Sequence, residues 1–278
     1  MSIQTQLPAL RATGRRRGTA QRGEARWTFL LIAVVLAILA VWEAVVRAGL
    51  VPEAFLPPPS KVLTAFLALL VEGEFWQAFA FSMGNVVVGL ALAIVVGVVV
   101  GLAVGWSPVL RFTVAPFLWL LYSTPKVALA PVIILALGLG SESKIALTFL
   151  LAVFPILLNT MEGAVTVSPS LVRAARVFGV RGPALGWKVI FPATLPFSLA
   201  GIRRGAALGF TGEVLGEFLG GTGGLGHMLE QAAYQFEMDE ALAMVVVMVI
   251  IANLTLSLIG LLQRKLAPWH DERTAAAS

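Results

Sequence analysis

The chain has 278 residues, of which 58% are hydrophobic and only 13% are charged, and its mean hydropathy is +0.90. These values exclude an ordinary soluble domain. The apolar runs are long enough to cross about 30 Å of hydrocarbon, so the sequence predicts an all-α, polytopic integral membrane protein. A net charge of +5 would suggest nucleic acid as a partner of a soluble protein, but here it is more typical of membrane loops, and no nucleic acid is expected.

The N-terminal segment, 1–26, contains six arginines and a single acid, Glu24, and is predicted to form a disordered basic tail. The apolar run that follows, 27–46, is long for the hydrophobic region of a cleaved signal peptide, and more such runs come after it. It is therefore interpreted as the first transmembrane span. Glu43 lies at its outer end beside Trp42, whose ring suits the membrane interface.

The next segment, 47–82, is predicted to leave the membrane. The run Pro57–Pro59 imposes an extended backbone, and Ser60 is suited to cap a helix. The apolar stripe of that helix consists of Val62, Phe66 and Leu69. Two interpretations stay open: a helix lying on the bilayer surface, and a connector packed on the bundle.

Five further apolar runs complete a transmembrane domain over 27–262. They lie at 83–106, 112–138, 145–164, 195–219 and 241–262. In the first of these, Gly97, Gly101 and Gly105 recur every four residues, a spacing that lets helices approach closely in lipid. The run at 112–138 is long for one straight helix and is interrupted at Ser123–Lys126, so we expect a kink or a break there.

A basic amphipathic insert, 168–194, lies between the fourth and fifth spans. Ser168 and Pro169 are typical of a helix start, and Gly179 supplies a stop because glycine adopts the left-handed conformation at little cost. A second short helix is predicted over 183–192. The insert is therefore expected to be a helix, a turn and a helix at a membrane surface.

This insert resembles the EAA loop of ABC importer permeases, the cytoplasmic element that docks into a groove of a separate ATPase subunit. The residues that match the pattern are Ala174, Ala175, Gly179, Ile190 and Pro192. Arg173 stands where the family usually has a glutamate, so the usual ion pair with the ATPase is not expected in its ordinary form. The resemblance implies contact with the ATPase through Leu171, Arg173, Ala174, Ala175, Phe178, Gly179 and Pro192.

The distribution of positive charge fits this arrangement when both termini are cytoplasmic. The N-terminal tail, the insert and the C-terminal tail, 263–278, then hold most of the lysines and arginines on the cytoplasmic side, as the positive-inside rule requires. The cations that fall outside are Arg47, Lys61, Lys126 and Lys144.

Motifs for bond-making chemistry are absent or out of context. Gly221, Gly223 and Gly226 match the letters of a dinucleotide-binding pattern, but they follow an apolar helix rather than a strand and predict a turn. None of the five lysines follows a glycine, so there is no Walker A loop, and the isolated His227 and His270 suggest no metal site. The absence of cysteine excludes disulfides. No catalytic residue, cofactor or metal is predicted, and the chain is not expected to be an enzyme.

The informative polar residues lie in the fifth span. Ionisable groups inside a membrane usually face the bundle interior, a partner or a water-filled path. Arg203 and Arg204 lie near the inner end of the span, where an arginine can also reach lipid phosphate. Glu213 and Glu217 are four residues apart and share a helix face. We expect Arg203, Glu213 and Glu217 to belong to the translocation path, with Glu213 lining or gating it.

The resemblance extends from about Trp42 to Trp269. It includes FLPPPSKV, ALAPVIILALGLGSESKI, FPILLNT and GGLGHMLEQAAYQF, which are similar to the nitrate, taurine and aliphatic sulfonate branch of the permeases. It implies a subunit of the bacterial inner membrane that works with a second permease copy, two ATPase subunits and an extracytoplasmic solute-binding protein. ATP hydrolysis in the partner would move the insert as a lever. A sulfonate, taurine or nitrate is the first expectation for the solute, while relatives also handle riboflavin or a pyrimidine precursor.

Two other classes of membrane protein are compatible with the hydropathy. An ion-coupled secondary transporter would use Glu213 or Glu43 as its proton or sodium site, but the sequence shows no convincing internal repeat and that mechanism has no use for the basic insert. A membrane scaffold without transport is the other alternative, and the acids of the fifth span argue against it.

Overall fold

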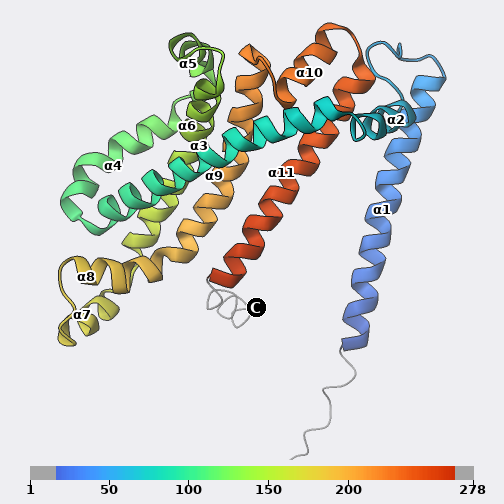
Figure 1. Ribbon diagram of the computed structural model, residues 1–278. Coiled ribbons are helices and arrows are strands. Elements are labelled where there is room, and N and C mark those ends of the chain that lie inside the picture. Colours follow the sequence, from blue (N-terminus) through green and yellow to red (C-terminus); the bar gives the residue numbers. More distant parts are fainter. Residues whose placement is uncertain (1–16, 267–278) are drawn as a thin grey trace, which may run out of the picture. The chain divides into compact units, whose positions relative to one another are not determined.

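The computed structural model describes residues 17–266, and within that range every regular element is a helix (Figure 1). Five helices of this range are long and apolar enough to cross a membrane, and a bent pair of helices adds a sixth if it counts as one span. The predicted all-α, polytopic class is confirmed. The chain divides into two compact units, one up to Lys61 and the other from Val62 onward.

The first unit contains α1 (Arg17–Arg47), whose apolar portion is Phe29–Arg47. Helix α1 begins within the segment that was predicted to be a disordered tail, so 17–26 is helical rather than disordered. Helices propagate cooperatively from an apolar stretch into the polar turns beside it, which explains the difference. The rest of that predicted tail, 1–16, lies outside the described residues.

Glu43, near the end of α1, is held by polar partners within this unit. Its Oε1 accepts hydrogen bonds from Arg47 Nε at 2.5 Å and from the Ser60 hydroxyl at 2.8 Å, and its Oε2 accepts from the Ser60 backbone N–H at 3.1 Å. Ser60 lies in the first turn of α2 (Pro59–Leu69), where backbone amides have no partner in the helix. The acceptor at this helix start is therefore Glu43, not the predicted Ser60 side chain.

The second unit contains the remaining helices. In chain order they are α3 (Gly73–Trp106), α4 (Pro108–Ser123), the 3-10 helix η1 (Lys126–Leu129), α5 (Ala130–Leu137), α6 (Ser141–Val165), α7 (Pro169–Val177), α8 (Pro183–Leu185), the π-helical turn η2 (Gly186–Ile190), α9 (Phe191–Gly220), α10 (Leu225–Tyr234) and α11 (Met238–Leu266). Helix α3 begins earlier than the predicted second span, so 73–82, predicted to leave the membrane, continues that helix. Helix α10 was not predicted from the sequence.

Helix α6 is the centre of this unit and packs between α3 and α9. Glycines make both approaches close: a Cβ atom added at Gly101 of α3 would lie 2.6 Å from the Leu157 carbonyl oxygen, and one at Gly205 of α9 would lie 2.8 Å from the Ala152 carbonyl oxygen. The predicted role of the α3 glycines in helix packing is confirmed by these short approaches, which leave no room for a side chain.

The expected break at Ser123–Lys126 is present. The helical segments on the two sides of the break, 108–123 and 126–137, are bent by 78° relative to each other. Side chains satisfy the carbonyl groups at the end of α4: the Thr124 hydroxyl donates to Leu120 O at 3.1 Å, and Lys126 Nζ donates to Tyr122 O at 2.7 Å. Since a broken helix in a bilayer needs partners for its freed backbone groups, these bonds explain how the break is tolerated.

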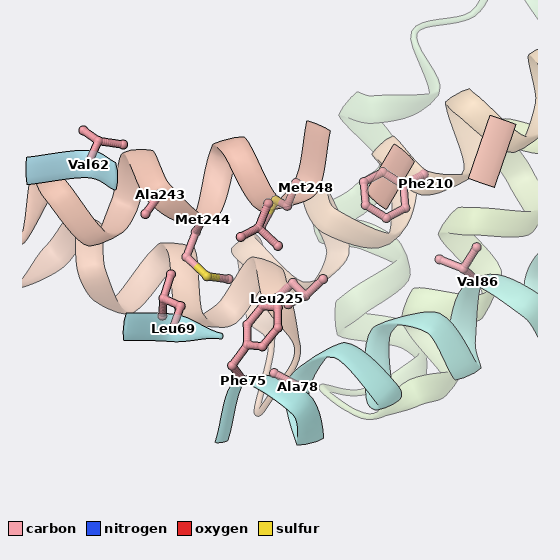
Figure 2. Packing of buried hydrophobic residues seen from close by; sticks show 11 residues of the cluster. Val62, Leu69, Phe75, Ala78, Val86, Phe210, Leu225, Ala243, Met244 and Met248 are labelled. Carbon is pink, nitrogen blue, oxygen red and sulfur yellow. The ribbon is translucent and has the colours of Figure 1, made fainter. Parts of the chain in front are cut away.

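Apolar side chains from α2, α3, α10 and α11 converge in a single core cluster (Figure 2). Val62 and Leu69 of α2 are buried in it, and Phe66 packs against it. Leu225 of α10 and Met244 of α11 are fully buried in the same cluster. The apolar stripe of α2 therefore faces protein, which favours the interpretation of that segment as a connector packed on the bundle.

Candidate functional site

The two carboxylates of α9 lie in a buried polar network. Glu213 has no exposed surface. Its Oε1 accepts a hydrogen bond from Asn85 Nδ2 of α3 at 2.8 Å, and its Oε2 accepts from the Thr148 hydroxyl of α6 at 2.9 Å. Each oxygen therefore has a donor from a different helix, and this buried carboxyl group joins the three central helices by hydrogen bonds.

Glu217, one turn further along α9, organises the start of α10. Its Oε1 accepts from the Ser82 hydroxyl at 2.6 Å, and its Oε2 accepts from the Gly226 backbone N–H at 2.8 Å. The Ser82 oxygen in turn accepts from the Leu225 N–H at 2.9 Å. The first two amides of α10 are thus satisfied, directly or through Ser82, by a carboxylate at the positive end of the helix. Gly224 precedes them with φ +99°, and a Cβ there would collide with the Glu217 carboxylate.

Lys144 of α6 is the cation of this region and is also fully buried. Its Nζ donates to the carbonyl oxygen of Leu139 at 2.5 Å and to that of Gly220 at 2.8 Å. Gly220 is the last residue of α9, where carbonyl groups lack partners and a cation is favoured. Lys144 was predicted to lie on the outer side of the membrane, before the fourth span; in the structure it is buried inside the protein and caps α9.

A second polar feature is a cavity of about 480 Å³ between α4, α6 and α9. Its lining residues are Trp119, Tyr122, Pro155, Leu158, Asn159, Glu162, Arg204, Ala207 and Leu208. Arg204 donates from a guanidinium nitrogen to Asn159 Oδ1 at 3.2 Å, and Asn159 Nδ2 donates to the Pro155 carbonyl oxygen at 2.7 Å. Asn159 thereby anchors the arginine to the backbone of α6.

The residues predicted for the translocation path are in different surroundings. Arg203 is exposed but is not among the residues that line this cavity, whereas its neighbour Arg204 is. Glu213 and Glu217 are enclosed within the chain in this conformation. That these three residues belong to the translocation path stays a prediction. The arginine that lines the cavity is Arg204, which was not predicted to belong to the path.

The basic insert forms a helix, a turn and a second helix (Figure 1). Helix α7 ends in a Schellman motif: Val180 N–H donates to Ala175 O at 3.0 Å, and Gly179 N–H donates to Arg176 O at 3.0 Å. Gly179 has φ +83°, as its predicted role as a helix stop requires. The Ser168 hydroxyl, predicted to cap α7, instead bonds the Ser170 hydroxyl at 2.6 Å.

The inner side of the insert is anchored to the bundle. Leu185 and Ile190 are buried against Ala164 at the end of α6. Trp106, the last residue of α3, covers Gly186 so closely that a Cβ there would lie 2.5 Å from its ring. From Gly186 the chain continues through the π-helical turn directly into α9. A displacement of the insert is therefore transmitted to α9 without an intervening loop.

The outer side of the insert exposes apolar and basic groups. Val177 and Phe178 are each 85% exposed, Trp187 is 69% exposed and Leu171 is 46% exposed. Among the residues predicted to contact an ATPase, Arg173, Ala174, Gly179 and Pro192 are also exposed, and Ala175 is half-buried. Arg176 and Arg181 line a cavity of about 510 Å³ beside Trp106. Apolar side chains exposed on a rigid, anchored element are typical of a surface that binds another protein.

Reasoning from the sequence missed most members of the buried network. Ser82, Asn85 and Thr148 are small polar residues inside apolar helices, and nothing in their spacing sets them apart from residues that bond their own backbone. The predicted turn at Gly221 and Gly223 is present between α9 and α10. Helix α10, which follows this turn, was not predicted; it begins after Gly224, whose φ is positive.

Comparison with known proteins gives one family. Residues 93–271 match the family described as Binding-protein-dependent transport system inner membrane component. The taurine transport system permease protein TauC of Escherichia coli (strain K12) is 33% identical over 89% of this chain and 92% of its own. The putative aliphatic sulfonates transport permease protein SsuC of Bacillus subtilis (strain 168) is 31% identical over 84% of this chain and 85% of its own. The riboflavin transport system permease protein RibX of Chloroflexus aurantiacus is 32% identical over 96% of this chain and 99% of its own.

Proposed function

The chain belongs to the family of binding-protein-dependent transport system inner membrane components and is the permease subunit of an ABC importer; from this premise we propose that it carries a small anion, a sulfonate, taurine or nitrate, across the inner membrane. Two relatives are named for taurine and aliphatic sulfonates, which supports this choice over riboflavin. Membership of the family decides against the ion-coupled transporter and the scaffold considered from the sequence.

The observation that carries the proposal for coupling is the insert, 168–194. Its inner side is packed on the ends of α3 and α6, while its outer side exposes Val177, Phe178 and Trp187. An element that is fixed to the core and presents apolar side chains outward suits the groove of an ATPase subunit. Since the insert continues without a break into α9, movement of the ATPase subunit would reach the central helices directly.

We assign the insert and both termini to the cytoplasm. The insert carries Arg173, Arg176, Arg181 and Lys188, and the positive-inside rule places such segments on the cytoplasmic side. An even number of spans returns the chain to the side where it started, which is consistent with the six spans of the fold. The extracytoplasmic side, with the turn between α9 and α10, would then meet the solute-binding protein.

The path itself is proposed to form between two copies of the chain. A row of side chains on α9 is exposed in the single chain and consists of Arg204, Leu208, Thr211 and Phe218, of which Leu208 is 41% exposed. A second copy related by a two-fold axis would cover this face, as in most closed assemblies of identical subunits. Arg203 is proposed to reach the path from the same helix, while Glu213 and Glu217 influence it through the packing of α3, α6 and α9.

The experiment for the coupling proposal is affinity purification of the tagged chain from membranes that also contain the ATPase subunit. Phe178→Asp replaces the most exposed aromatic side chain of the insert with a charge. We expect this variant to retain less than about a tenth of the ATPase subunit, because a desolvated anchor residue at an interface contributes about 2 kcal/mol or more.

Phe55→Asp is the matched control for this substitution. Phe55 is 68% exposed, in the loop after α1, which the same topology places outside the cell. The control should retain the ATPase subunit at the wild-type level. Equal retention by both variants would show that the insert is not the docking element, and loss by both would point to misfolding.

A further inference from the structure

The cavity between α4, α6 and α9 contains charges of both signs in a span of the bundle. Arg204 of α9 and Glu162 of α6 both line it, and its volume of about 480 Å³ lies within the range of small-molecule sites. Charged side chains in membrane spans are costly and usually face a pathway or a partner. Neither side chain belongs to the buried network of Glu213 and Glu217, and both are exposed in the single chain, where a solute can reach them.

Arg204 has hydrogen-bond donors that its contact with Asn159 does not use. A guanidinium group carries five N–H donors, and the hydrogen bond to Asn159 Oδ1 uses one of them. Within the described part of the chain no carboxylate forms an ion pair with Arg204. Asn159 is itself fixed by its bond to the Pro155 carbonyl oxygen. The guanidinium is therefore oriented on one side and available on the other for an oxyanion, which it binds in a fork geometry.

Glu162 supplies the opposite charge on the same wall of the cavity. Pro155, Asn159 and Glu162 follow one another at helical spacing on α6, so Glu162 lies about 4.5 Å further along the helix axis than Asn159. The described residues show no ion pair for its carboxylate. On the α4 side, the rings of Trp119 and Tyr122 complete the wall, and aromatic faces attract ammonium groups.

We propose that this cavity is a binding site of the translocation path for small zwitterions that carry a sulfonate and an amine, with Arg204 binding the sulfonate and Glu162 the ammonium group. This inference rests on the proposed function, because it requires sulfonate import. It selects amino-sulfonates over simple alkyl sulfonates and inorganic anions. It also gives Arg204, rather than Arg203, the role of anion-binding arginine.

The test uses the complete importer, with the solute-binding protein and the ATPase subunits made free of cysteine, reconstituted in lipid vesicles. Because the chain has no cysteine, a single introduced thiol is unique. Uptake of labelled taurine and of ethanesulfonate is measured for wild type, Arg204→Cys and Glu162→Gln. We expect Arg204→Cys to lower uptake of both solutes about tenfold, the effect of losing one charge-assisted interaction. Glu162→Gln should lower only taurine uptake.

Chemical modification separates charge from shape. A cationic methanethiosulfonate reagent should restore uptake by Arg204→Cys several-fold, whereas the anionic sulfonatoethyl reagent should not. Arg204→Lys keeps the positive charge and should retain part of the wild-type uptake rate. It replaces the cysteine variant in this test if Arg204→Cys does not assemble into the importer. Arg111→Cys is the control, since Arg111 lies over the Phe112 ring at 5.6 Å in the first turn of α4 and does not line the cavity.

The outcomes are distinguishable. If the wild-type importer takes up both solutes and Arg204→Cys does the same, the assignment of the cavity is overturned while sulfonate import stands. Rescue by both reagents alike would show that Arg204 only fills space, which also overturns the assignment. Loss of both solutes in Glu162→Gln would remove the role of Glu162 as the ammonium site. If wild type takes up neither solute although its ATPase is active, sulfonate import itself fails and this site fails with it.

Discussion

At the scale of single residues, the buried network of α9 is the feature with the largest energetic consequence. Glu213 and Glu217 have no exposed surface, and four donors on three other helices reach their oxygens. A buried carboxylate is costly unless its oxygens are satisfied. The network is therefore stable only as a complete set, and loss of one donor leaves a buried acceptor without its partner.

Thr148→Val tests this dependence. The substitution keeps the shape of the side chain and removes the hydroxyl that donates to Glu213 at 2.9 Å. We expect the free energy of unfolding in detergent to fall by about 1–3 kcal/mol, the typical cost of leaving a buried acceptor without its donor. Denaturation followed by circular dichroism gives the value.

Thr113→Val is the matched control for that measurement. Thr113 donates to the Val109 carbonyl oxygen of its own helix at 2.9 Å and is exposed. This change should alter stability by less than about 0.5 kcal/mol, as surface substitutions usually do. Equal effects of the two substitutions would show that the bond to Glu213 contributes nothing beyond the loss of a hydroxyl.

The residues of this network illustrate what could be read from the sequence. Glu213 and Glu217 were selected because acids in an apolar span are conspicuous. Their hydrogen-bond partners were not predicted, because they are distant in the sequence: Ser82 and Glu217 are separated by 135 residues. Lys144 was predicted to lie in an outer loop, where a lysine near a helix end commonly reaches water. In the structure its Nζ instead donates a hydrogen bond to Gly220 O, which the packing of α6 and α9 brings near.

At the scale of elements, the insert shows how one glycine determines the direction of the chain. Gly179 has φ +83° and open space around it, so its conformation rather than its size is what the turn requires. The Schellman bonds from Val180 and Gly179 close the end of α7 only in that conformation. The sequence predicted this stop, because glycine after an amphipathic run is a strong signal. It did not predict the π-helical turn before α9, which depends on the packing of Gly186 under Trp106.

Gly179→Ala is expected to loosen α7 without unfolding the bundle. An L-residue in the left-handed region costs about 1–2 kcal/mol, so amide hydrogens of α7 should exchange about tenfold faster. Hydrogen exchange with mass spectrometry measures this locally, and α11 should keep its wild-type rates. Gly260→Ala in α11 is the control: the position has open space and no positive φ, so exchange should not increase there. Unchanged exchange of α7 in Gly179→Ala would contradict the role of the turn.

At the scale of the whole molecule, the fold leaves one face of its central helices open. Helix α6 is enclosed by α3 and α9, and 15 of its 25 residues are buried. Helix α9 contacts α3, α6, α10 and α11, yet it keeps a row of exposed side chains that includes Arg204, Leu208 and Thr211. The six spans and the break in the third followed from hydropathy and from Ser123–Lys126. The sequence did not predict which side chains of α9 stay exposed, because this depends on how α3, α6 and α9 pack together.

Cysteine cross-linking tests whether a second copy covers that face. Thr211→Cys places the only thiol of the chain on the open face of α9, one to two turns from Arg204. Oxidation, or a short bifunctional maleimide, should convert more than about half of the protein to a covalent dimer if the two copies meet there. Val95→Cys, 62% exposed on α3, should stay monomeric on the same gel. Dimers from Val95→Cys alone would place the interface on α3 instead.

The charge of the insert determines which kind of surface it favours on the ATPase subunit. The insert carries Arg173, Arg176 and Arg181, the last two of which line a cavity with Trp106, so this surface is strongly basic. Complementary charge favours association, and the ATPase groove is therefore expected to be acidic around Phe178. Retention of the ATPase subunit should then fall as salt rises, since exposed charges are screened within about 8 Å at physiological ionic strength.

Arg173→Glu restores the usual family residue and is the decisive variant. With an acidic groove it turns attraction into repulsion, and we expect the dissociation constant for the ATPase subunit to rise about fivefold at low salt and to approach the wild-type value at high salt. Arg111→Glu makes the same change of charge away from the exposed Phe178 and Trp187 and should have a smaller effect. Tighter binding by Arg173→Glu would show that the groove of the ATPase subunit is basic at this position. Arg173 would then reduce the affinity of the wild-type chain. In either case the sign of the change reports the charge of the partner directly.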